Sequence, residues 1–233
     1  MTRHVLRNLL IVACLVHGAA HAAELFNGKD LSGWRKPTGA WMAAKAVALD
    51  AADPEKFVLT SGDGILANGE KGKTVNLVSE PEFGDIEAHI EFWIPKHSNS
   101  GVYVMSRYEI QIYDGEVKYP GQENGGIYGR TVGEKTIEGH SPLVNASKQP
   151  GEWQMLDFTF RAPRFDSSGK KISNAKFVKV VLNGKTIHEN VELNGPTRSA
   201  TSLEEKSTGP IMLQGNHGPV AFRNLRVTAI ELK

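Results

Sequence analysis

The chain has 233 residues, of which 40% are hydrophobic and 23% are charged, so it has enough apolar material for a folded core and is not a disordered chain. Its 27 Lys and Arg against 26 Asp and Glu give a net charge of +1, which excludes a nucleic-acid binder that relies on a general basic field. The single Cys excludes a disulfide framework and a cysteine-based zinc site.

Residues 1–22 are predicted to be a secretory signal peptide. Arg3 and Arg7 give a positive start, residues 9–16 form a short apolar run, and small residues near 22 provide a cleavage site. The run is too short to span a bilayer, which takes about 20 residues. A buried first strand or helix is one alternative, and lipoprotein processing at Cys14 is another. We therefore expect an exported protein, periplasmic or secreted, with no membrane span, whose domain covers residues 23–233.

Period-two alternation of apolar and polar residues, bounded by turn residues, predicts strands along the rest of the chain. In chain order, the predicted strands cover residues 85–94, 101–114, 153–162, 177–182, 185–188, 210–214 and 220–232. Asn183-Gly184 predicts a tight hairpin, because both turn positions require positive φ. Short helices are expected only within 199–206. Strands at this spacing, punctuated by Gly and Pro, predict an all-β sandwich or barrel in one domain.

The predicted strand over 101–114 is unusual because its second face is polar. Its even positions, from Val102 to Ile112, form an apolar row that faces the core. The odd positions are Tyr103, Met105, Arg107, Glu109, Gln111 and Tyr113. Alternate residues lie about 6–7 Å apart along a strand, so charged and amide groups line up between aromatic rings. Such a row can bind the hydroxyls and ring faces of a sugar. The alternative is an ordinary solvated face with cross-strand ion pairs.

Short motifs in a fixed order resemble one known family. They are Leu25–Trp34, Phe83–Glu87, Asn99–Tyr103, Tyr108–Ile112, Gly126–Tyr128, Pro150–Trp153, Leu182–Gly184, Leu213–Gln214 and Phe222–Asn224. Together they resemble the DUF1080 family, described as the 3-keto-disaccharide hydrolase or 3-keto-glucoside-1,2-lyase/3-keto-2-hydroxy-glucal hydratase domain. The resemblance covers essentially the whole mature chain. It implies a concanavalin A-like jelly-roll β-sandwich, bacterial export and action on glycosides already oxidised at C3.

Two positions depart from the family's pattern. Met105 stands where family members often carry an Arg, although Arg107 is kept. The family usually ends with Leu-Gln-Asp-His-Gly, whereas here His217 is displaced by one residue.

The implied substrate has its own chemistry. A ketone at C3 acidifies the proton on C2, because the resulting carbanion delocalises into an enolate. The glycosidic oxygen at C1 can then leave by elimination, and water added to the resulting glucal completes a net hydrolysis. Such a site needs a base near C2, an electrophile at the C3 oxygen and an acid at the leaving group.

These needs assign roles to the residues of the family motifs. Glu109 is the predicted base, Arg107 or a bound divalent cation stabilises the enolate, and His217 is an acid, a base or a metal ligand. The predicted substrate-binding residues are Asn99, Gln111 and Gln214 for sugar hydroxyls, and Tyr103, Tyr113 and Tyr128 for stacking. Any metal would be held by Asp114, Glu109 and His217, and the sequence indicates no other cofactor.

Two other functions stay open. A non-catalytic carbohydrate-binding module can use the same jelly roll, since fold does not fix function. An ordinary glycoside hydrolase usually needs two carboxylates that flank one bond, and the polar row offers Glu109 without a second acid. The chain carries no P-loop, dinucleotide-binding or nucleophile-elbow motif, which argues against nucleotide chemistry and against serine-esterase chemistry.

Overall fold

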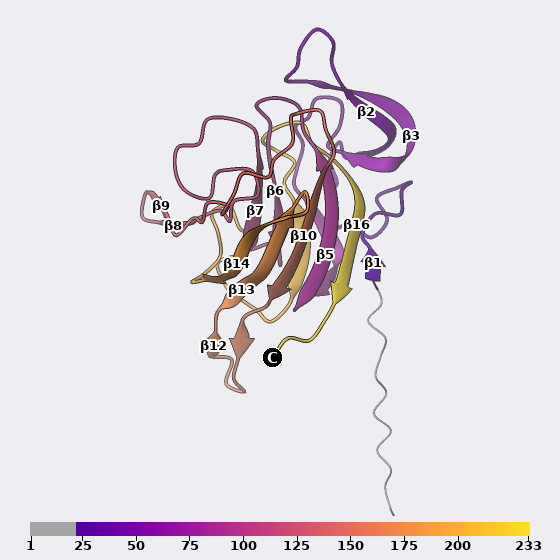
Figure 1. Cartoon of the computed structure of the whole chain (residues 1–233). Helices are drawn as coiled ribbons and strands as arrows, with labels where there is room; N and C mark the ends of the chain where they lie inside the picture. The colour runs from indigo at the N-terminus through magenta and orange to yellow at the C-terminus, as the bar shows by residue number, and fades with distance from the viewer. Residues whose placement is uncertain (1–21) are drawn as a thin grey trace, which may run out of the picture.

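The computed structural model describes residues 22–233, which fold into strands and turns without a helix (Figure 1). The predicted signal peptide lies outside these residues except for Ala22. Within the described range, there is accordingly no helix long and apolar enough to cross a membrane.

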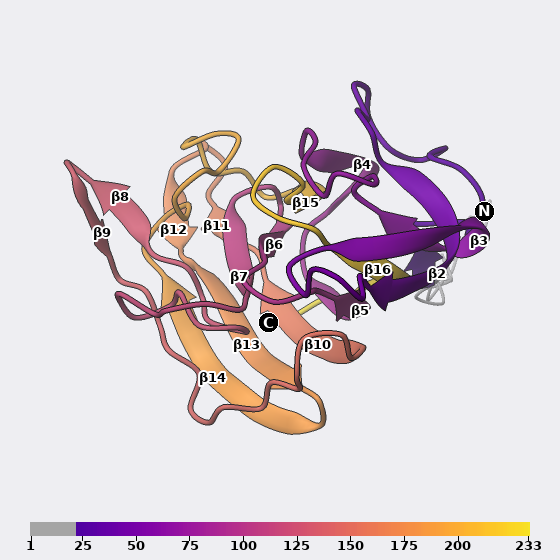
Figure 2. The same cartoon turned by 90° about the horizontal axis from the view of Figure 1, so that it is seen from above.

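Two antiparallel sheets form a jelly-roll sandwich of the concanavalin-like kind (Figures 1 and 2). The strands of the larger sheet are β1 (Ala22–Glu24), β2 (Met42–Leu49), β3 (Phe57–Ala67), β5 (Ile86–Trp93), β10 (Gln154–Arg161), β13 (Ala175–Leu182), β14 (Lys185–Leu193) and β16 (Ala221–Ala229). They run in the order β14-β13-β10-β5-β16-β3-β2, and β1 also pairs with β16. The smaller sheet contains β4 (Leu77–Phe83), β6 (Asn99–Val104), β7 (Tyr108–Tyr113) and β15 (Gly209–Leu213), in the order β4-β15-β6-β7.

Two short hairpins project from the sandwich (Figure 1). One pairs β8 (Arg130–Val132) with β9 (Lys135–Ile137), and the other pairs β11 (Arg164–Phe165) with β12 (Lys171–Ser173). The predicted hairpin at Asn183-Gly184 is confirmed, since it joins β13 to β14 and has φ values of 51° and 80°.

The core lies between the two sheets, and strand alternation explains its composition. The prediction for 85–94 is confirmed, because Ile86, Ile90 and Phe92 of β5 are buried while their neighbours face outward. On the adjacent β10, Leu156 and its apolar alternates join the same cluster. Each fully buried side chain of this size contributes about 1.5–3 kcal/mol to folding, so the alternation determines which face of each strand packs inward.

The predicted long strand over 101–114 is wrong, because it is a hairpin. The chain turns between β6 and β7 at Met105 and Ser106, whose φ values are 55° and 54°. The register pairs Tyr103 with Glu109 and therefore keeps odd positions opposite odd positions. Tyr103, Glu109 and Gln111 of the polar row thus remain on one face of the small sheet, spread over two strands instead of one.

Other sequence expectations also need correction. Residues 199–206 form an irregular loop and not a short helix. Strands β2, β3 and β4 were not predicted, because their sequences lack clear alternation. β3, for example, carries glycines at positions 62 and 64 and is exposed over its central part.

Candidate functional site

A pocket of about 220 Å³ lies on the face of the small sheet that points away from the core. Its floor consists of Tyr103, Glu109 and Gln111 from β6 and β7, with Gln214 immediately after β15. The remaining lining residues come from the end of β6 and from loops: Asn99, Tyr119, Gln122, Tyr128, Arg198, Ser199 and His217. The sheet therefore supplies a rigid floor, and the loops supply the walls.

Glu109 is a buried acid at the centre of this floor, with 2% of its surface exposed. Gly101 lies diagonally across the hairpin from Glu109, and a Cβ at Gly101 would lie 2.2 Å from Glu109 Oε1, so only glycine leaves room for the carboxyl group. The side-chain amide of Gln111 is taken in the orientation in which its nitrogen faces acceptors. In this orientation the Gln111 nitrogen donates to Glu109 Oε1 (3.1 Å). No Lys, Arg or His within residues 22–233 forms an ion pair with Glu109.

This environment shifts the acidity of Glu109. Burial raises the pKa of its carboxyl to about 8, and a hydrogen bond from Tyr103 opposes that rise only in part. A carboxyl with a pKa near neutrality can both take and give a proton under physiological conditions. A strongly perturbed acid in a pocket is also a common mark of a functional site.

Three phenol groups surround the carboxyl. The Tyr103 hydroxyl accepts from Gln214 Nε2 (3.3 Å), and the Tyr119 and Tyr128 hydroxyls share a hydrogen bond of 2.5 Å. The rings of this second pair meet edge-on, with centroids 5.9 Å apart. Burial raises the pKa of Tyr103 and of Tyr128 well above the ordinary value. These hydroxyls therefore stay protonated and can donate to a sugar oxygen or to a developing oxyanion.

Arg198 and His217 lie at the exposed side of the pocket. The loop of Arg198 is fixed to β7 by Thr197, whose Oγ1 donates to the Arg107 carbonyl (3.0 Å) and accepts from the Glu109 amide (3.2 Å). Partial burial lowers the pKa of His217, and the nearby charges of Lys73 and Arg198 lower it further. His217 is therefore a neutral imidazole at physiological pH, and Arg198 is the cation of the pocket.

Most predicted site residues meet in this pocket: Asn99, Tyr103, Glu109, Gln111, Tyr128, Gln214 and His217. The expectation that Arg107 lies beside Glu109 is corrected. Arg107 falls in the turn after β6, where its Nε donates to the Glu204 carbonyl (2.7 Å) and its Nη1 to the Met105 carbonyl (2.8 Å). Its guanidinium thus holds loops together and faces a different cavity.

Tyr113 and Asp114 are also displaced from the pocket. They line a second cavity at the end of β7, where the Tyr113 hydroxyl donates to the Glu116 carbonyl (3.1 Å) and an Asp114 oxygen accepts from the His97 amide (2.8 Å). The expected metal set of Asp114, Glu109 and His217 is therefore not assembled. Across residues 22–233, no three His, Cys, Asp or Glu side chains come together as a metal site.

Four pocket residues were not predicted from the sequence: Tyr119, Gln122, Arg198 and Ser199. All four lie in loops, where no periodicity indicates which side chains face inward. Arg198 is the most important of them, because it provides the positive charge that the sequence interpretation had assigned to Arg107.

Residues 21–228 match the sequence profile of the 3-keto-alpha-glucoside-1,2-lyase-like domain. The chain belongs to this family. Family membership over nearly the whole described chain is consistent with the pocket, in which a perturbed acid lies among hydroxyl and amide groups. It also gives the protein a carbohydrate-active role.

The chain is also similar to solved structures from Parabacteroides distasonis. One, described as a "putative glycosyl hydrolase", is 27% identical, with a TM-score of 0.64, and the match covers 90% of this chain and 84% of that one. Another with the same description is 21% identical, with a TM-score of 0.57, and the match covers 90% and 100% of the two chains. A comparison with functionally curated proteins gave no match.

Proposed function

We propose that this protein is an exported enzyme that cleaves 3-keto-glycosides by elimination across C1 and C2, followed by hydration of the glucal. The observation that carries the proposal is Glu109, a buried carboxyl whose pKa is raised to about 8. It faces a pocket of amides, phenols, one imidazole and one guanidinium. Family membership supports the carbohydrate substrate.

In the first step, the Glu109 carboxylate takes the proton from C2 of the 3-keto sugar. The electrons of the C2–H bond move into the C2–C3 bond, and the C3 oxygen becomes an enolate oxygen. Arg198 and the Tyr119–Tyr128 pair are the groups in this pocket that can stabilise that negative charge. The burial of Glu109 favours the transfer, since the product carboxylic acid is neutral.

In the second step, the enolate collapses and expels the aglycone. The C3 carbonyl re-forms, a double bond forms between C1 and C2, and the C1–O bond breaks. The departing oxygen takes a proton from the Glu109 carboxylic acid, which becomes a carboxylate again. Water then adds its oxygen to C1 and a proton returns to C2, which gives the free 3-keto sugar and restores Glu109.

The composition of the pocket favours this route over ordinary glycoside hydrolysis. Glu109 is the only carboxylate among the described residues that line it. Direct hydrolysis of a glycosidic bond normally uses a pair of carboxyl groups on either side of that bond. Elimination needs only one carboxyl group, which takes the proton from C2 and then gives it to the departing oxygen. The pKa of Glu109 suits both transfers.

Export is part of the proposal and depends on the sequence of residues 1–22. A positive start, a short apolar run and small residues before position 23 are the features of a secretory signal peptide. We propose that the enzyme acts on extracytoplasmic sugars, in the periplasm or outside the cell. Fractionation of cells that express the full chain, with N-terminal sequencing of the product, tests this part separately.

The catalytic proposal is tested by offering the purified protein a glucoside and its 3-keto form. We expect release of the aglycone from the keto form alone, with deuterium from solvent D2O incorporated at C2 of the product. Turnover of the plain glucoside would support an ordinary hydrolase, and saturable binding without turnover would support a binding module.

Two variants assign the roles. Glu109→Gln keeps the shape of the side chain but cannot take a proton, so turnover should fall by at least about 10³-fold, within the range for loss of a general base. His217→Ala should lower turnover less, because His217 lies at the exposed side of the pocket. Full turnover by both variants would refute the assignment of this pocket.

A further inference from the structure

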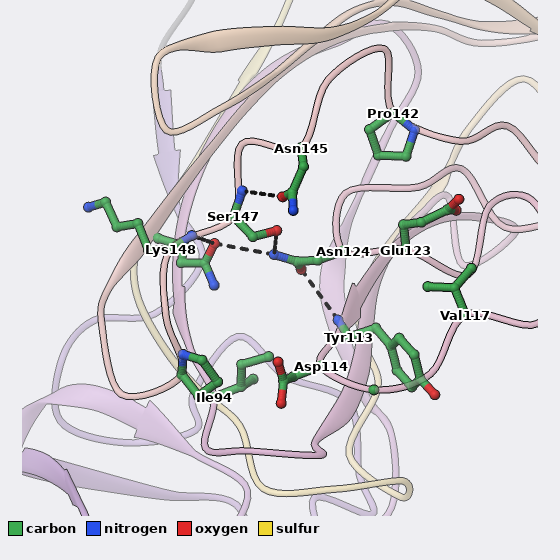
Figure 3. A pocket seen from close by; sticks show the side chains of 13 residues that line it. Ile94, Tyr113, Asp114, Val117, Glu123, Asn124, Pro142, Asn145, Ser147 and Lys148 are labelled. Atoms are coloured by element: carbon green, nitrogen blue, oxygen red, sulfur yellow. Dashed lines mark hydrogen bonds between the residues drawn. The ribbon is translucent and has the colours of Figure 1, made fainter.

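A second cavity of about 270 Å³ opens where the ends of three strands meet two loops (Figure 3). Ile94 directly follows β5, Tyr113 ends β7, and Gln154 begins β10. The loops that close the cavity lie within residues 114–124 and 142–150. Of the described residues that line this cavity, none also lines the Glu109 pocket, so it is a separate site.

Gln154 is a buried residue that gives this cavity a hydrogen-bond donor without a protein partner. Only 2% of the residue is exposed. Its Oε1 accepts from the Lys148 amide (3.1 Å), from Asn124 Nδ2 (3.2 Å) and from Asn183 Nδ2 (3.2 Å), which fixes the orientation of the side-chain amide. Within residues 22–233, its Nε2 donates to no protein acceptor. This nitrogen belongs to a residue that lines the cavity, so a ligand there can accept the hydrogen bond that no protein group takes.

Further polar groups face the same space. Figure 3 shows Asn124, Asn145 and Ser147 on one side of the cavity and Asp114 on another. Asn145 uses its Oδ1 to accept from the Ser147 amide (3.0 Å), and its amide nitrogen is left for other partners. One Asp114 oxygen accepts from the His97 amide (2.8 Å), and the other can accept from a ligand. The cavity thus offers amide donors and a carboxylate acceptor.

Apolar groups complete the walls and surround the mouth. Ile94, Tyr113 and Pro142 line the cavity. Val117 lines it as well, although 44% of its surface is exposed. Leu143 and Val144, which come directly after Pro142, are 71% and 42% exposed. The lining of the cavity thus has apolar surface beside its polar groups, as ligand pockets usually do.

The amide donors, the carboxylate acceptor and the apolar walls of this cavity together suit a neutral ring that carries several hydroxyl groups. Hydroxyls can both accept from the amides of Gln154 and Asn145 and donate to Asp114, and the ring faces can pack on Tyr113 and Val117. Two carboxylates at the cavity, Asp114 and Glu123, outnumber its one cation, Lys148, whose Nζ donates to the Trp153 carbonyl (3.0 Å), and they disfavour an anion. We propose that this cavity is a second carbohydrate-binding site, which holds one neutral pyranose unit apart from the Glu109 pocket. The proposal does not depend on the reaction assigned to Glu109.

The ring could belong to a separate glycan or to the aglycone of a substrate held at Glu109. Amide NMR shifts of the purified protein, titrated with methyl α-D-glucoside and with maltose, distinguish these sources. A separate glycan predicts saturable shifts at the cavity with both sugars. An aglycone predicts that only maltose shifts the two sites, with one common Kd.

Two variants and a control test the cavity itself. Gln154→Glu keeps the acceptor oxygen that holds three neighbours and replaces the free donor with an acidic oxygen, and Val117→Ser removes an apolar contact of the cavity. Each should weaken sugar binding by at least about fivefold, as expected for loss of one contact worth about 1 kcal/mol. Val132→Ser on β8, where the residue is 49% exposed, is the matched control and should leave the Kd unchanged.

The possible results separate the two proposals. Absence of saturable shifts at residues 113–124 and 142–154 with either sugar would overturn the second site, as would unchanged affinity in both variants. Loss of turnover at the Glu109 pocket would leave those shifts in place. The catalytic proposal can therefore fail while the second site stands, and the reverse also holds.

Discussion

The burial of Glu109 should make the stability of the protein depend on pH in a way that one substitution removes. The folded-state pKa of this carboxyl is raised to about 8 from an ordinary value of 4.5. The folded state therefore holds the proton more tightly than the unfolded state does. The stability that this provides is complete below about pH 4.5 and is lost as the pH rises to about 8.

The size of the effect follows from the shift. Each unit of difference in pKa corresponds to about 1.4 kcal/mol, so between pH 5 and pH 8.5 the ionisation of Glu109 should cost the folded wild type about 4 kcal/mol. Glu109→Gln carries no titrating proton and should not show this loss. Its free energy of unfolding, relative to that of the wild type, should therefore rise by about 4 kcal/mol over the same interval.

Urea unfolding of both proteins at pH 5, 7 and 8.5 measures this double difference. In this double difference, any pH-independent cost of the Gln side chain cancels between pH values, and the contributions of the other titrating groups cancel between the two proteins. The exposed Glu87→Gln on β5 is the matched control and should follow the wild type at every pH. A difference between Glu109→Gln and wild type that stays constant with pH would refute the raised pKa, and with it the physical basis for Glu109 as the base.

The remaining predictions concern the base, the space around it and the far end of the core. If Glu109 is the base, kcat/KM for a 3-keto-glucoside should rise with pH and level off above about 8, and a profile that falls over pH 6–8 would contradict this role. Gly101→Ala should lower turnover at least about tenfold, because the new Cβ would lie 2.2 Å from Glu109 Oε1. Gly195→Ala, whose Cβ would have no neighbour closer than 3.6 Å, should remain active in the same assay. Asp85 is buried, which raises its pKa, but hydrogen bonds from Arg164 and from two backbone amides outweigh burial and leave the pKa lowered. This stabilisation is present above the unfolded pKa and is lost as the pH falls through the folded one, so Asp85→Asn should cost about 3 kcal/mol at pH 7 and much less near pH 2, as measured by urea unfolding.

Strand alternation predicted the part of the site that lies on the sheet. It placed Tyr103, Glu109 and Gln111 on one polar face although the prediction of one continuous strand was wrong. The reason is that the register of the hairpin pairs odd positions with odd positions, so the turn does not change which side chains share a face. Arg107 does not share that face because it lies in the turn, and side chains in a turn do not alternate between the two faces of a sheet.

Strand alternation could not predict which loop side chains reach the pocket. Arg198 reaches the pocket because Thr197 attaches its loop to β7 through hydrogen bonds between residues about 90 positions apart. Tyr113 continues the odd row in sequence, but it lines the other cavity at the end of β7. No local pattern encodes either outcome.

Local patterns in the amino-acid sequence were enough to predict the all-β class, the family, the two faces of the strands and the central acid. It could do so because period-two burial and short motifs are local properties of the chain. Only the tertiary structure decided the environment of that acid. The pKa of Glu109 is raised by burial, for which Gly101 across the hairpin leaves room, and the hydrogen bond from Tyr103 opposes that rise only in part. The free amide of Gln154 is likewise created by neighbours that are distant in sequence, since Asn124 and Asn183 hold its oxygen and leave its nitrogen facing the second cavity.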